Sequence, residues 1–95
     1  MALHRQAARR DGNEAALRAY VEAHGACWQP LSITGGPDAI VGCAGRDALV
    51  EVKQPKEKLR ASQEQWHRDW RGSAPWVIRT EADADMLIRW LRDSR

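Results

Sequence analysis

The chain has 95 residues, of which 43% are hydrophobic and 29% are charged. These fractions exclude a disordered chain, and the length indicates a single globular domain close to the lower size limit for a buried core. The net charge is only +2, but twelve of the fifteen basic residues are arginine, whose planar guanidinium suits phosphate.

The sequence also argues against a membrane or disulfide-rich protein. No apolar run is long enough to span a bilayer, and the N-terminus has no signal-peptide core. Cys27 and Cys43 lie far apart without a paired-cysteine motif, so neither a zinc knuckle nor a disulfide framework is predicted. We therefore expect a cytoplasmic domain over residues 13–95, with no membrane contact.

The first expected helix follows a basic lead-in, residues 1–12, that ends in turn-forming residues and is expected to be a mobile arm or a short irregular segment. Asn13 is a suitable N-cap and Gly25 a suitable C-cap, which predicts a helix over residues 14–24. Its apolar face would contain Leu17, Tyr20, Val21 and His24. Glu14 would stand at the edge of this buried face.

Three strands are expected next. Residues 26–33 contain Pro30, which predicts an edge strand. Residues 38–42 and 49–53 alternate as a hairpin, and a type II′ turn at Gly45-Arg46 would place Asp38 opposite Lys53. In that register Ile40 lies opposite Glu51.

The remaining elements predict a mixed α/β layer. A helix over residues 61–71 would begin with a Ser62–Gln65 capping box, and a strand over residues 75–79 would follow it by a crossover connection. Thr80 would start a last helix. Residues expected to pack inward from this last helix are Met86, Leu87, Trp90 and Leu91. The order αβββαβα indicates a mixed four-stranded sheet flanked by helices.

The five tryptophans are mainly interpreted as core, because Trp66, Trp70 and Trp90 have helical core spacing in a chain without phenylalanine. Base stacking by Trp28 or Trp76 is the alternative. His67 is interpreted as a helix-surface residue, since a lone histidine without a catalytic motif is usually structural.

The strongest chemical signal is a cluster of charges on the hairpin. Asp38, Glu51 and Lys53 would share one sheet face, where carboxylates could hold Mg²⁺ or Mn²⁺ with the Val52 carbonyl as a further ligand. Glu14 could complete the metal shell. An ion-pair ladder on a solvated sheet face is the competing interpretation.

These residues resemble the PD-(D/E)xK nuclease superfamily, in which an acid precedes a Glu-x-Lys motif. Four segments are similar to those of the small phage and bacterial VRR-NUC (virus-type replication-repair nuclease) domains: Arg9–Glu14, Gly36–Asp38, Val50–Lys53 and Ser62–His67. The resemblance implies a restriction-endonuclease-like fold, with Lys53 at the scissile phosphate and Gln63 as a supporting residue. It implies that the metal is held by Glu14, Asp38 and Glu51. The family's Thr-Pro or Ser-Pro helix start is replaced here by Arg60-Ala61, which leaves Gln65 as an alternative to Gln63.

The expected function is a metal-dependent DNA endonuclease, selective for branched or flapped DNA in replication, repair or recombination and working as a homodimer. Water would attack directly, because no paired Ser, Cys or Tyr nucleophile is evident. Basic residues expected to contact the DNA backbone include Arg9, Arg10, Lys56, Lys58 and Arg60. The alternatives are an inactive nuclease-fold module that binds nucleic acid or protein, and an RNA nuclease.

Overall fold

A computed structural model describes the backbone of residues 2–93 and the side chains of residues 12–93. Within this part of the chain the elements are α1 (Ala2–Ala23), β1 (Cys27–Pro30), β2 (Ala39–Cys43), β3 (Arg46–Val52), α2 (Ala61–Asp69), β4 (Trp76–Ile78) and α3 (Glu81–Asp93). The predicted order αβββαβα is confirmed. No helix among the described residues is long and apolar enough to cross a membrane.

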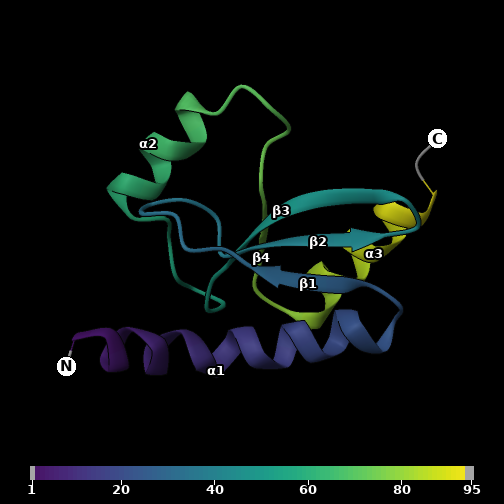
Figure 1. The fold of residues 1–95 in the computed structure, drawn as a ribbon, viewed down its shortest axis with the longest axis horizontal. Coiled ribbons are helices and arrows are strands. Elements are labelled where there is room, and N and C mark those ends of the chain that lie inside the picture. Colours follow the sequence, from purple (N-terminus) through teal and green to yellow (C-terminus); the bar gives the residue numbers. More distant parts are fainter. Residues whose placement is uncertain (1, 94–95) are drawn as a thin grey trace.

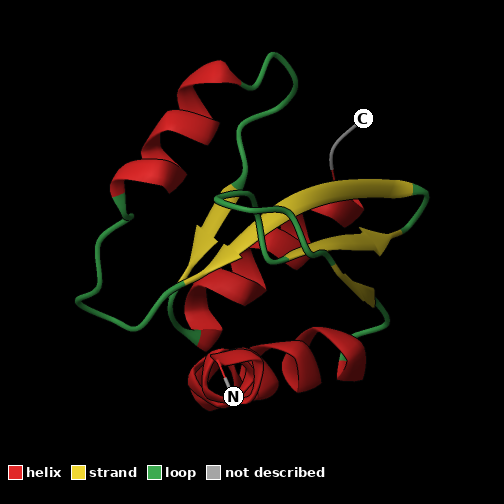
Figure 2. Cartoon of the chain, turned by 60° about the vertical axis from the view of Figure 1, so that its left-hand side comes forward, coloured by secondary structure: helices red, strands yellow, loops and turns green. Residues whose placement is uncertain are grey.

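The four strands described form one mixed sheet in the order β1-β2-β3-β4. The first three strands are antiparallel, whereas β4 runs parallel to β3 after the α2 crossover, as predicted. Helices α1 and α3 lie against each other beneath one face of this sheet, and α2 stands apart on the other side (Figures 1 and 2). The two faces therefore have different surroundings.

The apolar core lies on the face covered by α1 and α3. Alternate residues of β2 and β3 point into it, so that Ala39 pairs with Val50 and Val41 with Ala48. Helix α3 contributes the largest share of the remaining core, through Ala84, Leu87, Ile88 and Leu91. The opposite face of the same strands carries Ile40, Leu49 and Glu51, and it is the face on which the candidate site is built.

Helix α1 is longer than the sequence predicted, because it begins at Ala2 and not near Glu14. The prediction of an irregular lead-in over residues 1–12 is wrong in this respect. Alanine, arginine and glutamine dominate this stretch, and their helix propensity continues the helix through Gly12. Asn13 is thus inside the helix, and its side chain is available for a tertiary contact.

The end of α1 agrees with the prediction of a glycine cap. Gly25 has a φ of 90°, and its amide donates to the Glu22 carbonyl at 3.2 Å while the Ala26 amide donates to the Val21 carbonyl at 3.1 Å. This pair of bonds is the Schellman arrangement. Strand β1 then covers only Cys27–Pro30 of the expected residues 26–33, at the edge of the sheet as Pro30 requires.

The hairpin turn lies one residue earlier than predicted. Cys43 pairs with Arg46, so Ala44 and Gly45 form the loop, with φ values of 56° and 80°. Positive φ at both positions is typical of type I′, which matches the twist of the flanking strands better than other turns. As a result the strands pair two residues out of the expected register, and Ile40 lies opposite Leu49 instead of Glu51.

Two predictions about buried faces are also wrong. Met86 is 61% exposed and Trp90 is 38% exposed, because α3 turns Ala84 and Ile88 toward the sheet instead. The Trp90 ring instead packs against the Trp76 ring. It also makes a cation–π contact with Arg46, whose guanidinium carbon lies 4.1 Å from the centroid of the Trp90 ring. On α1, Leu17 and Val21 are buried as predicted, Tyr20 is half-buried and His24 is exposed.

Candidate functional site

Strand β3 ends in a pair of buried opposite charges. Glu51 is 1% exposed and Lys53, directly after the strand, is 3% exposed, with Nζ 3.9 Å from the Glu51 carboxylate. Lys53 Nζ also lies 3.6 Å from the carboxylate of Glu57, which is 40% exposed. Burial of this degree contradicts a solvated ion-pair ladder, because removing both charges from water carries a large desolvation cost.

Asp38 joins this pair from the loop before β2. Its carboxylate accepts a hydrogen bond of 2.7 Å from the Val52 amide, and its own amide donates to the Val50 carbonyl at 2.9 Å. Asp38 therefore lies beside Val50–Val52 and not opposite Lys53, which corrects the predicted pairing. The expected convergence of Asp38, Glu51 and Lys53 at one end of the hairpin is nevertheless present.

Helix α2 brings Gln63 to the same place. Gln63 is 9% exposed, its Nε2 donates to the Glu51 carboxylate at 2.9 Å, and its Oε1 accepts from the Arg60 amide at 2.8 Å. One side chain thus caps the start of α2 and holds Glu51. The alternative residue, Gln65, instead donates to Asp69 on the exposed side of the helix.

The predicted start of this helix at residue 61 is confirmed, but the predicted Ser62–Gln65 capping box is wrong. The structure starts α2 at Ala61, with Gln63 rather than Gln65 returning to the first backbone amide. The helix ends at Asp69, two residues earlier than expected. Gln63 therefore lies on the side of α2 that faces the sheet, where it reaches Glu51.

Asn13 is a site residue that sequence reasoning missed. Its Nδ2 donates to the Lys53 carbonyl at 2.6 Å and to the Arg79 carbonyl at 3.1 Å, so it joins α1 to the ends of β3 and β4. Glu14, the next residue on α1, is half-buried. The helix therefore holds the backbone of Lys53, and no local sequence signal distinguishes this role of Asn13 from an N-cap.

Replacement of Asn13 by alanine is expected to lower the free energy of unfolding by about 1–3 kcal/mol, because two partly buried carbonyl groups lose their donor. The effect is measured by urea denaturation. Arg18→Ala on the exposed side of α1 is the control and is expected to cost less than about 0.5 kcal/mol. An Asn13→Ala protein as stable as the control would show that the bridge contributes little.

The predicted DNA-contacting residues fall into two groups. Lys56, Lys58 and Arg60 are exposed between β3 and α2, close in sequence to Lys53. Arg9 and Arg10 belong to the part of α1 whose side chains lie outside the described residues.

The loop between β3 and α2 also affects the pKa of Glu57. The Gln54 amide donates a hydrogen bond to the Glu57 carboxylate, and this bond, together with the nearby Lys53, lowers the pKa of Glu57, although partial burial opposes the shift.

His67 is not the plain surface residue that the sequence suggested. Its ring is half-buried on α2, and this burial lowers the pKa of the imidazole below its ordinary value. The neutral form is therefore favoured in the folded chain. His67 contacts the edge of Trp66, with ring centroids 6.2 Å apart.

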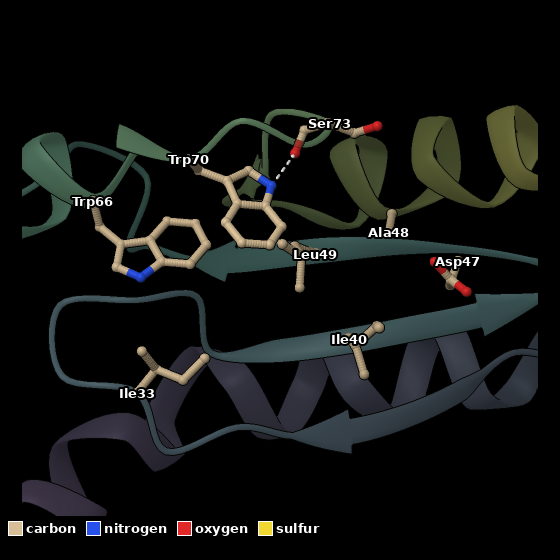
Figure 3. Close-up of a pocket in the computed structure, with 8 residues that line it drawn as sticks. All are labelled: Ile33, Ile40, Asp47, Ala48, Leu49, Trp66, Trp70 and Ser73. Atoms are coloured by element: carbon tan, nitrogen blue, oxygen red, sulfur yellow. Dashed lines mark hydrogen bonds between the residues drawn. The ribbon is translucent and has the colours of Figure 1, made fainter. Parts of the chain in front are cut away.

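Trp66 on α2 and Trp70 directly after it also depart from expectation, because they do not enter the core. Trp66 is half-buried and Trp70 is 44% exposed, and the two rings stack with centroids 5.0 Å apart. They form one side of a groove on the sheet face opposite the core (Figure 3). The buried tryptophan is Trp28, at 5% exposure.

The carboxylates of the site suit a hard cation whose remaining coordination positions are filled by oxygen atoms of a substrate and by water. Among the described side chains, no group of three or more His, Cys, Asp and Glu residues is arranged to hold a metal ion. The predicted metal set of Glu14, Asp38 and Glu51 is not such a group among these side chains, and it stays a prediction. Asp38 and Glu51 alone would form a set of two carboxylates, which Mg²⁺ commonly uses together with phosphate oxygens and water. Comparison of the chain with known protein families, curated proteins and solved structures gave no match.

Proposed function

We propose that this chain is a metal-dependent DNA endonuclease with a restriction-endonuclease-like fold of the VRR-NUC type. The observation that carries the proposal is the buried Glu51–Lys53 pair, joined by Gln63 from α2 and flanked by Asp38. Buried charges that pack against one another at the end of a sheet are costly, and such arrangements cluster at catalytic sites.

Each residue has a role that its position supports. Asp38 and Glu51 are the carboxylates that would hold Mg²⁺ or Mn²⁺, with the Val52 carbonyl as a further oxygen ligand. When bound, such an ion supplies charge neutralisation at the phosphate and lowers the pKa of a coordinated water. Asp38 is held by the Val52 amide and Glu51 by Gln63, so both carboxylates are oriented before substrate arrives.

The other residues would act on the DNA and on the attacking water. Lys53 would place its ammonium beside the scissile phosphate and offset the negative charge that develops as water attacks phosphorus and the bond to the leaving oxygen breaks. Glu14 would accept the proton of the attacking water through a bridging solvent molecule. Lys56, Lys58 and Arg60 would follow the DNA backbone, and a single small domain of this kind would recognise DNA shape, such as a branch or flap, and not base sequence.

The proposal is tested with a panel of linear, flapped, four-way and single-stranded DNA in Mg²⁺, Mn²⁺ or EDTA. We expect cleavage of branched or flapped DNA in either metal and complete loss of cleavage in EDTA. Cleavage of none of these substrates, together with equal DNA binding in metal and in EDTA, would instead identify an inactive nuclease-fold module.

A further inference from the structure

The groove defined by Ile33, Ile40, Leu49, Trp66 and Trp70 has no role in the proposed chemistry. Its volume is about 360 Å³, which is within the range of small-molecule pockets. Figure 3 shows the two indole rings along one side, Ile33 and Ile40 along the other, and Asp47 toward one end. The groove is apolar and aromatic, and it lies on the face of the sheet that α1 and α3 do not cover.

Trp70 is held in its exposed position by specific contacts. Its ring stacks on Trp66 with an interplanar angle of 16°, and its Nε1 donates to the Ser73 carbonyl at 3.1 Å. The ring also folds over Gly72, where a Cβ atom would lie 2.7 Å from the indole nitrogen. An exposed indole that is fixed in this way is an ordered flat surface, so little conformational entropy is lost when another ring stacks on it.

The opposite wall depends on a glycine. A Cβ atom at Gly36 would lie 2.6 Å from Ile33 Cγ2 and 3.2 Å from Trp66 Nε1. The loop before β2 can therefore approach α2 closely, and Ile33 closes the groove while remaining 46% exposed. The shape of the groove therefore depends on the close packing of this loop against α2.

The groove lies beside Asp38 and Glu51, the two carboxylates that we call the acidic site. Ile40 and Leu49 lie on the same sheet face as Asp38 and Glu51, two residues away along each strand, which is about 7 Å. On α2, Trp66 follows Gln63 by three residues and so shares its side of the helix. Chemical groups attached to a ligand in the groove would therefore lie close to Asp38 and Glu51.

The charge of the surrounding segment favours a polyanion. Residues 54–73 contain five basic residues and three acidic ones, a difference of +2. Of the three acids, Glu57 lies beside Lys53 and Asp69 accepts hydrogen bonds from Gln65. The exposed basic residues of this segment are Lys56, Lys58, Arg60, Arg68 and Arg71.

We propose that the groove binds an unpaired nucleobase of single-stranded DNA, stacked on Trp70, with the adjoining phosphate directed to the acidic site. The inference rests on the proposed nuclease function and names its substrate, a strand with unpaired nucleotides beside the scissile phosphate. A base in a duplex is stacked on both faces and cannot enter. Stacking on aromatic side chains tolerates every base, and Asp47 offers an acceptor to an exocyclic amine.

Binding is measured in EDTA, so that cleavage does not interfere, by fluorescence anisotropy of a labelled single strand and of the same sequence as a duplex. Trp70→Ala is expected to weaken binding of the single strand by about five- to hundredfold and to leave duplex binding unchanged. Trp90→Ala removes another partly exposed tryptophan, on α3, and is expected to bind both DNAs like the wild type. A 2-aminopurine base in the strand is expected to lose fluorescence when the strand binds the wild type. It is expected to keep its fluorescence when the strand binds Trp70→Ala.

Folding is checked by circular dichroism, and Trp70→Leu, which keeps an apolar side chain, is tested in parallel. Wild-type affinity for the single strand in both Trp70 variants would overturn the proposal, as would a Trp70 substitution whose only effect is on self-association. Absence of cleavage with Trp70-dependent binding intact would refute the nuclease function alone. Cleavage in metal with no dependence of binding on Trp70 would refute the groove alone.

Discussion

Replacement of Asp38 by asparagine is expected to reduce the rate of DNA cleavage by about 100- to 1,000-fold. The asparagine side-chain oxygen can still accept the hydrogen bond from the Val52 amide, so the loop should keep its position. What is lost is the negative charge, which a hard cation requires of its ligand. Single-turnover cleavage of the best substrate in Mg²⁺ measures the rate, and urea denaturation shows whether stability is retained.

The matched control is Asp69→Asn, which removes an exposed carboxylate from α2 without touching the acidic site. It is expected to cleave at the wild-type rate. If Asp38→Asn also cleaves at that rate, Asp38 serves only to anchor its loop, and the assignment of the metal site to Asp38 and Glu51 fails.

The order of elements was predictable because its signals are local. Gly25 closes α1, Pro30 restricts β1 to the edge, and a helix between two strands favours a parallel crossover. The gathering of Asp38, Glu51 and Lys53 was also accessible, since strand alternation sets the sheet face of each residue. A shift of two residues in register preserves that face, so the site survived an error in the turn.

The turn itself could not be read from glycine alone. Sequence reasoning placed Gly45 first in the loop, whereas the structure gives that position to Ala44 at a φ of 56°. Alanine is disfavoured there, and the pairing of β2 with β3 stabilises it. Local preference was outweighed by the observed pairing, in which Cys43 lies opposite Arg46 and Val41 lies opposite Ala48.

The tryptophans show a second limit. Helical spacing indicates that Trp66 and Trp70 share a side of α2, and their stacking confirms it. Spacing does not reveal whether another element covers that side, and in the structure α1 and α3 both cover the opposite face of the sheet. The role of Asn13 was inaccessible for a similar reason, because its partners are 40 and 66 residues away.

Replacement of Lys53 by methionine is expected to lower the free energy of unfolding by about 3–5 kcal/mol, because Glu51 then remains buried without its cationic neighbour. For a small domain this is a large part of the total stability. Glu51→Gln is expected to cost less, since the amide oxygen still accepts from Gln63 and Lys53 still has Glu57 at 3.6 Å. Urea denaturation of both variants measures the difference.

The double variant Glu51→Gln/Lys53→Met separates the charge effect from a loss of packing. With both charges removed, no uncompensated ion is left in the interior, and the double variant is expected to be more stable than Lys53→Met alone. If the double variant is instead as unstable as the sum of the two single variants, the two side chains are energetically independent. The buried pair would then not be the interaction that organises this end of the sheet, and the proposal built on it would lose its principal support.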